Sequence, residues 1–310
     1  MLAYTGNGAY CYANSLHMSL LSAGAQREEI PDPGFIECLT TMPFGNMYLD
    51  LESGPLAFFS PVTIDPNEGL VRAVKALGWT FEEQRGGSDE EALARLRAAV
   101  SKEKVLVGPI DMGYLSYSPT HKYQVGADHF VVVLALENDH VLLHDPQGYP
   151  CAMLPMNEFM QAWKAERIDY KTAPYTMRTA FRKIEHVSRQ EMIERTLPLI
   201  RENLLANPGG PVAFGGVEAL TRIADALRGP KSNDLRDLLL HFGLPLAARR
   251  NADGAAFLRE AGNTETAHYM EQQAVLYGQA QYKGAHKQWA HVADLIEQIA
   301  ELEQQLIAAF

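Results

Sequence analysis

The spacing of apolar residues near the N-terminus predicts a helix that begins at about Tyr12. One face of this helix, with the spacing i, i+3, i+7 and i+10, is formed by Ala13, Leu16, Leu20 and Ala23. Further helices are predicted over 66–77, over 88–102, where Ser88 precedes an acidic first turn, and over 155–163. Between the first two of these four helices, the Pro- and Gly-rich passage 31–54 is expected to be irregular with short elements.

The pattern changes to short, continuous apolar runs after residue 104. Three such runs cover 105–110, 130–136 and 141–143, and the segment 137–140 is short enough to be a hairpin between the last two. Two more strands are predicted over 79–84 and within 169–186. These runs predict a central antiparallel sheet that is buried on at least one face.

Helical periodicity dominates the chain after about residue 187. The predicted helices cover 189–207, 217–227, 234–240, 253–261, 264–283 and 286–307. We therefore expect an α+β domain over 1–186, built on the central antiparallel sheet, and a mostly helical domain over 187–310.

Composition and charge exclude several classes of protein. The 310 residues are 47% hydrophobic and 21% charged, and 38 acidic against 27 basic residues give a formal net charge of −11. Because Arg249-Arg250 is the one basic cluster that stands out, nucleic-acid binding is not expected. No apolar run approaches the ~20 residues of a membrane span, and the start of the chain does not resemble a signal peptide. We expect a cytoplasmic protein.

Three cysteines, at positions 11, 38 and 151, are spaced neither as a disulfide framework nor as a zinc site, so no metal is expected. Cys11 differs from the other two because it directly precedes the first predicted helix. The unpaired N–H groups and the positive end of the helix dipole at that place stabilise a thiolate. Cys11 is therefore a candidate nucleophile, and the alternative is a small buried apolar residue.

Potential partners for Cys11 lie on the last two predicted strands. His129 begins one strand and Asp145 ends the next, so the short hairpin between them brings both to the same edge of the sheet. An imidazole there can accept a thiol proton, and a carboxylate can orient the imidazole. The alternatives are a structural histidine at a strand end and an Asx-turn aspartate before Pro146. His144 is expected on the opposite face of the sheet, and His17 is expected to point away from Cys11.

Four segments carry a resemblance to a known family: YCYANSL at 10–16, IDMGYLSY at 110–117, GADHFVVV at 126–133 and LLHDPQG at 142–148. They resemble the butirosin-biosynthesis-protein-H N-terminal family, which is related to the peptidase C39-like branch of the papain-like fold. The helical remainder is similar to the domain that commonly follows in that family. The resemblance implies a papain-like cysteine hydrolase or transferase core, with Cys11 as acyl acceptor, His129 as base and Asp145 as the group that orients it.

The chain departs from the papain-like pattern upstream of Cys11. A glutamine that helps to form the oxyanion hole is expected six residues before the cysteine, and Thr5 occupies that position. Asn7 is the nearest amide and is our candidate donor. Asp111 either binds a substrate amine or caps a strand, and Tyr114 either lines the cleft or packs in a loop.

The function expected from these features is that of a cysteine-dependent acyltransferase or amide hydrolase in secondary-metabolite or small-molecule metabolism, without a cofactor. The family resemblance implies a small-molecule amine or amide as substrate and an acyl carrier protein or acyl thioester as donor. The acidic net charge disfavours an acidic carrier unless Arg249-Arg250 forms a local basic patch. A homodimer could form through the long final helix. The alternative function is that of a non-catalytic accessory or binding protein that retains the scaffold.

Overall fold

The computed structural model describes residues 2–6, 8–168, 170, 172–229 and 233–310. The chain divides into two compact units, one formed by 1–36 with 77–186 and the other by 37–76 with 187–310. The sequence predicts that 37–76 belongs to the N-terminal domain. The structure groups this segment with the C-terminal residues instead, because its strand β1 (Met47–Leu51) pairs with β9 (Ala213–Gly215).

A six-stranded sheet with the order β3-β8-β4-β5-β6-β7 forms the centre of the first unit. All five neighbouring pairs are antiparallel. The three apolar runs form its adjacent strands β4, β5 and β6, and Glu137 pairs with His140 at the predicted hairpin. The strand expected within 169–186 is β8, while residues 169 and 171 lie outside the described part of the chain. The strands of this sheet are β3 (Trp79–Gln84), β4 (Val105–Asp111), β5 (Asp128–Glu137), β6 (His140–Asp145), β7 (Tyr149–Pro155) and β8 (Met177–Lys183).

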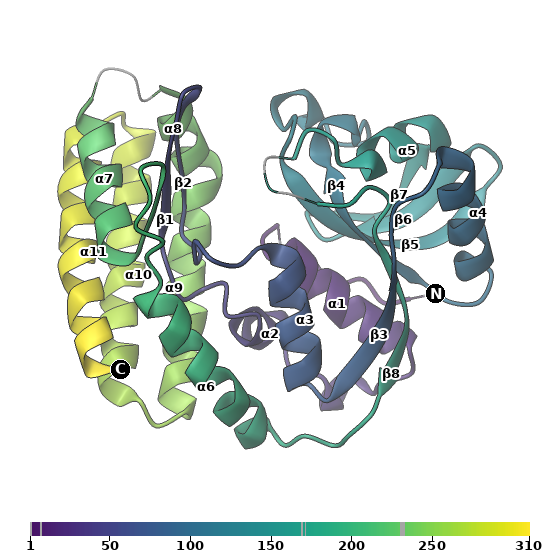
Figure 1. Ribbon diagram of the computed structural model, residues 1–310, viewed down its shortest axis with the longest axis horizontal. Helices are drawn as coiled ribbons and strands as arrows, with labels where there is room; N and C mark the ends of the chain where they lie inside the picture. Colours follow the sequence, from purple (N-terminus) through teal and green to yellow (C-terminus); the bar gives the residue numbers. More distant parts are fainter. Residues whose placement is uncertain (1, 7, 169, 171, 230–232) are drawn as a thin grey trace. The chain divides into compact units, whose positions relative to one another are not determined.

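Helices cover both faces of this sheet (Figure 1). Val131 and Val133 of β5 pack in one core with α4 (Asp89–Val100) and α5 (Met156–Lys164). Val132 points to the other face and packs against Met18 of α1. The alternation of side chains along a strand thus explains why β5 is apolar at successive positions.

The first helix, α1 (Cys11–Ser22), is buried over all of its residues 12–20. The expectation of a single apolar face was therefore incomplete, and Ala23 lies beyond the end of the helix and is exposed. The polar residues that this burial encloses have hydrogen-bond partners. Ser15 Oγ donates to the carbonyl oxygen of Phe130 at 3.0 Å, and Ser19 Oγ donates to that of Ser15 at 2.8 Å.

The second unit combines a three-stranded antiparallel sheet, with the order β2-β1-β9, with helices. The passage 31–54, expected to be irregular, contains a helix and β1 and leads into β2 (Gly54–Phe58). The helix predicted over 253–261 begins earlier, at Leu244, directly after a π-helical turn over Leu239–Gly243. The helices outside those already described are α2 (Pro33–Leu39), α3 (Pro66–Ala76), α6 (Arg189–Leu205), α7 (Gly216–Arg228), α8 (Asn233–Leu238), α9 (Leu244–Glu260), α10 (Thr264–Ala285) and α11 (Trp289–Ala309).

The fold class is therefore mixed α+β with antiparallel sheets and a helical C-terminal region, as the sequence predicts. None of the helices in the described part of the chain has both the length and the apolarity that a membrane span needs.

Candidate active site

Cys11 is the first residue of α1 and is half-buried. Its backbone N–H has no acceptor within the helix, because the first N–H groups of a helix lie ahead of its first carbonyl partners. The preceding residue, Tyr10, is buried and has φ 60° and ψ 49°, a left-handed conformation that is uncommon outside glycine. Strained backbone of this kind concentrates at functional sites, where the surrounding structure holds it in place.

The structure brings His129 and Asp145 together at one end of strands β5 and β6. Nε2 of His129 lies 2.6 Å from Oδ1 of Asp145, and both side chains are buried. The Cys11 thiol is hydrogen-bonded to the His129 side chain. Because Nε2 faces the carboxylate, Nδ1 is the ring nitrogen left for the thiol. The thiol, the imidazole and the carboxylate thus form one hydrogen-bonded series.

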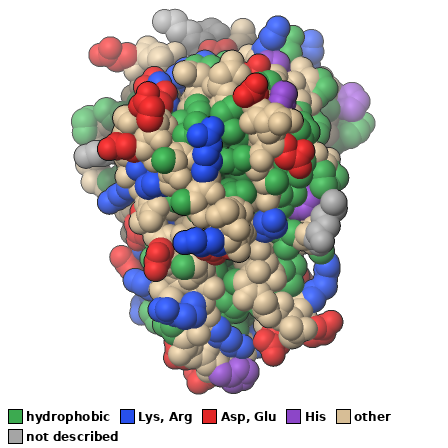
Figure 2. Space-filling view, turned by 90° about the vertical axis from the view of Figure 1, so that its right-hand side faces the viewer, with side chains coloured by type: hydrophobic (Ala, Val, Ile, Leu, Met, Phe, Trp, Pro, Cys, Tyr) green, Lys and Arg blue, Asp and Glu red, His purple; other side chains and the backbone are tan. Residues whose placement is uncertain are grey.

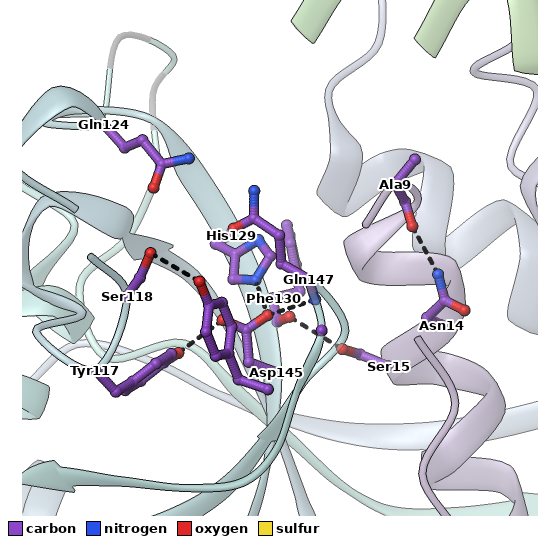
Figure 3. A network of polar contacts seen from close by, with 12 residues as sticks. Ala9, Asn14, Ser15, Tyr117, Ser118, Gln124, His129, Phe130, Asp145 and Gln147 are labelled. Atoms are coloured by element: carbon purple, nitrogen blue, oxygen red, sulfur yellow. Dashed lines mark hydrogen bonds and ion pairs between the residues drawn. The ribbon is translucent and has the colours of Figure 1, made fainter. Parts of the chain in front are cut away.

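Three further groups hold the Asp145 residue in place, and two of them, Gln147 and Tyr117, are labelled in Figure 3. Its Oδ1 also accepts a hydrogen bond from the backbone N–H of Gln147 at 2.7 Å, and its Oδ2 accepts one from the Tyr117 hydroxyl at 2.8 Å. Its backbone carbonyl accepts a third from the Tyr4 hydroxyl at 2.9 Å. With its oxygens satisfied in this way, the carboxylate has a fixed orientation toward His129.

The electrostatics of the site depend on burial and on the neighbouring charges. Burial raises the pKa of the Cys11 thiol, and the hydrogen bond and charge of His129 oppose this rise. Burial acts to lower the pKa of His129, but Asp145 and then Cys11 together hold that pKa well above its usual value. Burial acts to raise the pKa of Asp145, but the charge and hydrogen bond of His129, with the hydrogen bonds from Gln147 and Tyr117, bring it below the usual value. The helix start therefore does not by itself set the thiol pKa, which desolvation dominates.

Thr5, which occupies the position of the papain-like glutamine, does not donate toward the thiol. Thr5 Oγ1 lies 3.1 Å from Nδ1 of His17, so this threonine interacts with the helix and not with the thiol. Asn7, the candidate donor, lies outside the described residues. His144 contacts the carbonyl of Leu2 at 3.1 Å, away from the His129–Asp145 pair, as the alternation along its strand predicts.

Asp111 is fully engaged as a loop anchor. Its Oδ1 accepts hydrogen bonds from the backbone N–H groups of Gly113 at 2.8 Å and Gly126 at 3.0 Å, and its Oδ2 lies 2.5 Å from Nε of Arg167. Asp111 is 1% exposed, so of the two expected roles the geometry favours capping over binding a substrate amine. The Arg167 guanidinium lies 4.1 Å from the centre of the Tyr114 ring, which places Tyr114 in the same anchor.

The basic pair considered as a docking patch does not form one. Arg250 is buried, and its Nη2 lies 2.7 Å from Oε1 of the buried Glu37. Arg249 is half-buried and lies 3.6 Å from Asp253. The face of the molecule in Figure 2 shows basic and acidic side chains interspersed with each other.

The sequence did not predict that Tyr4, Tyr117 and Gln147 contact Asp145. Tyr117 and Gln147 lie in two of the segments that carry the family resemblance, so a closer inspection of those segments could have singled them out. Tyr4 has no such signal, because only the tertiary structure brings the N-terminal segment to the turn after β6.

Comparison with known proteins identifies relatives of the chain. Residues 210–310 match the family model described as the YobF C-terminal domain. Over 305 residues the chain is 30% identical to the protein named Uncharacterized protein YobF from Bacillus subtilis (strain 168), and the match covers 98% of this chain and 96% of that protein. Since the similarity extends over almost the full length of both proteins, the chain belongs to the YobF family.

Proposed function

We propose that the chain is a cysteine-dependent acyltransferase or amide hydrolase that works through an acyl-enzyme on Cys11. The observation that carries the proposal is the hydrogen-bonded series from Cys11 through His129 to Asp145. A thiol, an imidazole and a carboxylate in this order can act as nucleophile, general base and orienting group. The same series, with the cysteine at a helix start and its partners on adjacent strands, supports assigning the first unit to the papain-like core of the butirosin-biosynthesis-protein-H N-terminal family.

The reaction has two halves. In the first, Sγ of Cys11 attacks the carbonyl carbon of an amide or thioester while Nδ1 of His129 takes the thiol proton. The C–N or C–S bond of the tetrahedral intermediate then breaks, and His129 returns the proton to the leaving amine or thiolate. In the second half, His129 takes a proton from water or an amine, which attacks the acyl-cysteine thioester, and the Cys11 sulfur leaves and regains a proton. Asp145 stabilises the imidazolium that forms in each half.

The acyl donor that we favour is a small amide or thioester. An acidic carrier protein would need a basic docking surface on a chain of net charge −11. The burial of Arg250 against Glu37 removes one half of the basic pair that the sequence offered for this purpose. In this proposal both the acyl donor and the acceptor amine are small metabolites.

Intact-mass measurement of the acyl-enzyme tests the proposal. Incubation with acyl-N-acetylcysteamine thioesters and activated esters is expected to add one acyl mass to the wild-type protein, and Cys11→Ala is expected to abolish the adduct. Cys151→Ser is the matched control, because Cys151 is also half-buried and lies in the same unit. An adduct that persists in Cys11→Ala would contradict the proposal.

A second function, that of a non-catalytic accessory protein on the same scaffold, is favoured by two observations. Thr5 stands in place of the oxyanion-hole glutamine and bonds His17, and burial raises the pKa of the Cys11 thiol. Iodoacetamide labelling distinguishes the two functions. A nucleophilic Cys11 is labelled faster at pH 7 than Cys151, whereas an accessory protein would label slowly at Cys11 and form no acyl adduct.

A further inference from the structure

The proposed acyl transfer needs a donor that the site residues named so far do not provide. The tetrahedral intermediate carries negative charge on its oxygen, and preorganised N–H groups commonly stabilise it. The Cys11 backbone N–H is one such group, because it has no acceptor within α1. Thr5 is not a second one, because its hydroxyl bonds His17.

The turn that follows Asp145 lies directly against the segment before Cys11. The backbone N–H of Gly8 donates to the Pro146 carbonyl at 3.2 Å, and the Tyr4 hydroxyl accepts a hydrogen bond from the N–H of Gly148 at 2.9 Å. A Cβ atom on Gly6 would lie 2.5 Å from the Pro146 carbonyl oxygen, so the two backbones approach too closely there for any side chain. The residue between Pro146 and Gly148 is thereby held at the rim of the site.

That residue, Gln147, has a side-chain amide without a role in the fold. Its backbone N–H binds the same Asp145 oxygen as Nε2 of His129, and Figure 3 shows the two interactions that converge on this oxygen. Its Oε1 is enclosed and has no hydrogen-bond partner among the residues that the structure describes. By contrast, Oε1 of Gln124, the other glutamine in that view, lies 3.4 Å from Oγ1 of Thr120. An enclosed amide without a partner in a native structure calls for a ligand or another explanation.

We infer that Gln147 supplies the side-chain donor of the oxyanion hole. The inference rests on the proposed acyl transfer. Rotation of the amide about its last side-chain torsion exchanges Nε2 and Oε1, so Nε2 can face the site. The carbonyl oxygen of the substrate then lies between Nε2 of Gln147 and the backbone N–H of Cys11. The glutamine that the sequence lacks six residues before the cysteine is thus replaced by one in the turn after β6. The ligand class is an acyl compound with an accessible carbonyl group.

Two reactions of the same thiol test this assignment. Acylation by an acyl-N-acetylcysteamine thioester develops an oxyanion, whereas alkylation by iodoacetamide forms a C–S bond at a CH₂ carbon, expels iodide and develops none. In Gln147→Ala we expect the rate of burst acylation to fall about 100- to 1,000-fold. We expect the rate of alkylation and its pH profile to stay as in the wild type. Gln147→Glu should lose acylation at least as strongly, because a carboxylate repels the oxyanion, and Gln124→Ala is the matched control that should keep both rates.

Two outcomes would overturn the assignment while leaving the proposed function intact. One is acylation of Gln147→Ala at the wild-type rate. The other is a parallel loss of acylation and alkylation, which would show that Gln147 shields or positions His129. Absence of acylation in the wild type would instead contradict the proposed function itself, and with it this inference.

Discussion

The two units of the chain each bury a carboxyl group, and their pKa values shift in opposite directions. Asp145 of the first unit is 1% exposed and has a lowered pKa. Glu303 of α11, in the second unit, is 3% exposed and has a raised pKa. Burial disfavours the charged form of both groups, so their partners must account for the difference.

The partners of the two carboxyl groups differ in charge. For Asp145 burial is the largest single effect, but the charge and hydrogen bond of His129, with the hydrogen bonds from the Gln147 N–H and the Tyr117 hydroxyl, together lower the carboxyl pKa by more than burial raises it. For Glu303 burial is the largest effect, and the hydrogen bonds from the amides of Asn46 and Gln273, each at 3.0 Å, only partly oppose it. An adjacent cation therefore decides which buried acid stays ionised, and amide donors alone do not. We interpret Glu303 as a neutral hydrogen-bonding residue of the core and Asp145 as an anion that acts on His129.

The largest expected effect comes from neutralising each acid in turn. Asp145→Asn removes the anion that orients His129 and stabilises its charged form. We expect burst acylation of Cys11 to slow on the order of 10³–10⁴-fold. Glu303→Gln is the matched control, because it replaces a neutral buried acid by its amide and should leave acylation unchanged. If both variants are acylated at the same rate, our interpretation that the two carboxyl groups differ in function is wrong.

An intermediate effect on stability is expected from Glu303. Glu303→Leu leaves the buried amides of Asn46 and Gln273 without an acceptor, which costs about 1–3 kcal/mol for each group. Urea unfolding measures this loss. Urea unfolding of the Asp145→Asn variant measures the loss of stability from changing the buried acid of the first unit.

The pH dependence of the same measurement reports the ionisation of Glu303. Its pKa is higher in the folded than in the unfolded state, so its contribution to stability is complete below the unfolded pKa and is lost as the pH rises through the folded pKa. Relative to the wild type, Glu303→Gln should therefore gain stability as the pH is raised from about 4.5. A constant difference between the two proteins across that range would show that Glu303 is ionised in the folded state.

The smallest expected effect concerns the thiol itself. His129 opposes the rise in the Cys11 pKa that burial causes. In His129→Gln burial acts without this opposition, so the pH profile of iodoacetamide labelling should move to higher pH and labelling at pH 7 should slow several-fold. His144→Gln is the control, since His144 contacts Leu2 and not the thiol. An unchanged profile in His129→Gln would mean that the two side chains are not coupled.

The sequence predicted local structure well where one period dominated. The three apolar runs became β4, β5 and β6, and the capping pattern at Ser88 became a capping box with Glu91. It failed in 31–54, where the many Pro and Gly residues hid a helix and β1. Pairing of β1 with β9, which follows much later in the chain, stabilises that region. A single-sequence pattern contains no information about such a partner.

The pairing of His129 with Asp145 could be predicted from the sequence alone, because a short hairpin leaves two adjacent strands one possible antiparallel arrangement. Cys11 could be selected only as a residue at a helix start. Its hydrogen bond with His129 depends on α1 packing against one face of the sheet, which is a contact between distant parts of the chain. The same holds for the role that we infer for Gln147, which depends on the hydrogen bonds of the turn after β6 with Tyr4 and Gly8. Local periodicity thus determined the regular elements outside 31–54, and long-range packing decided which side chains meet.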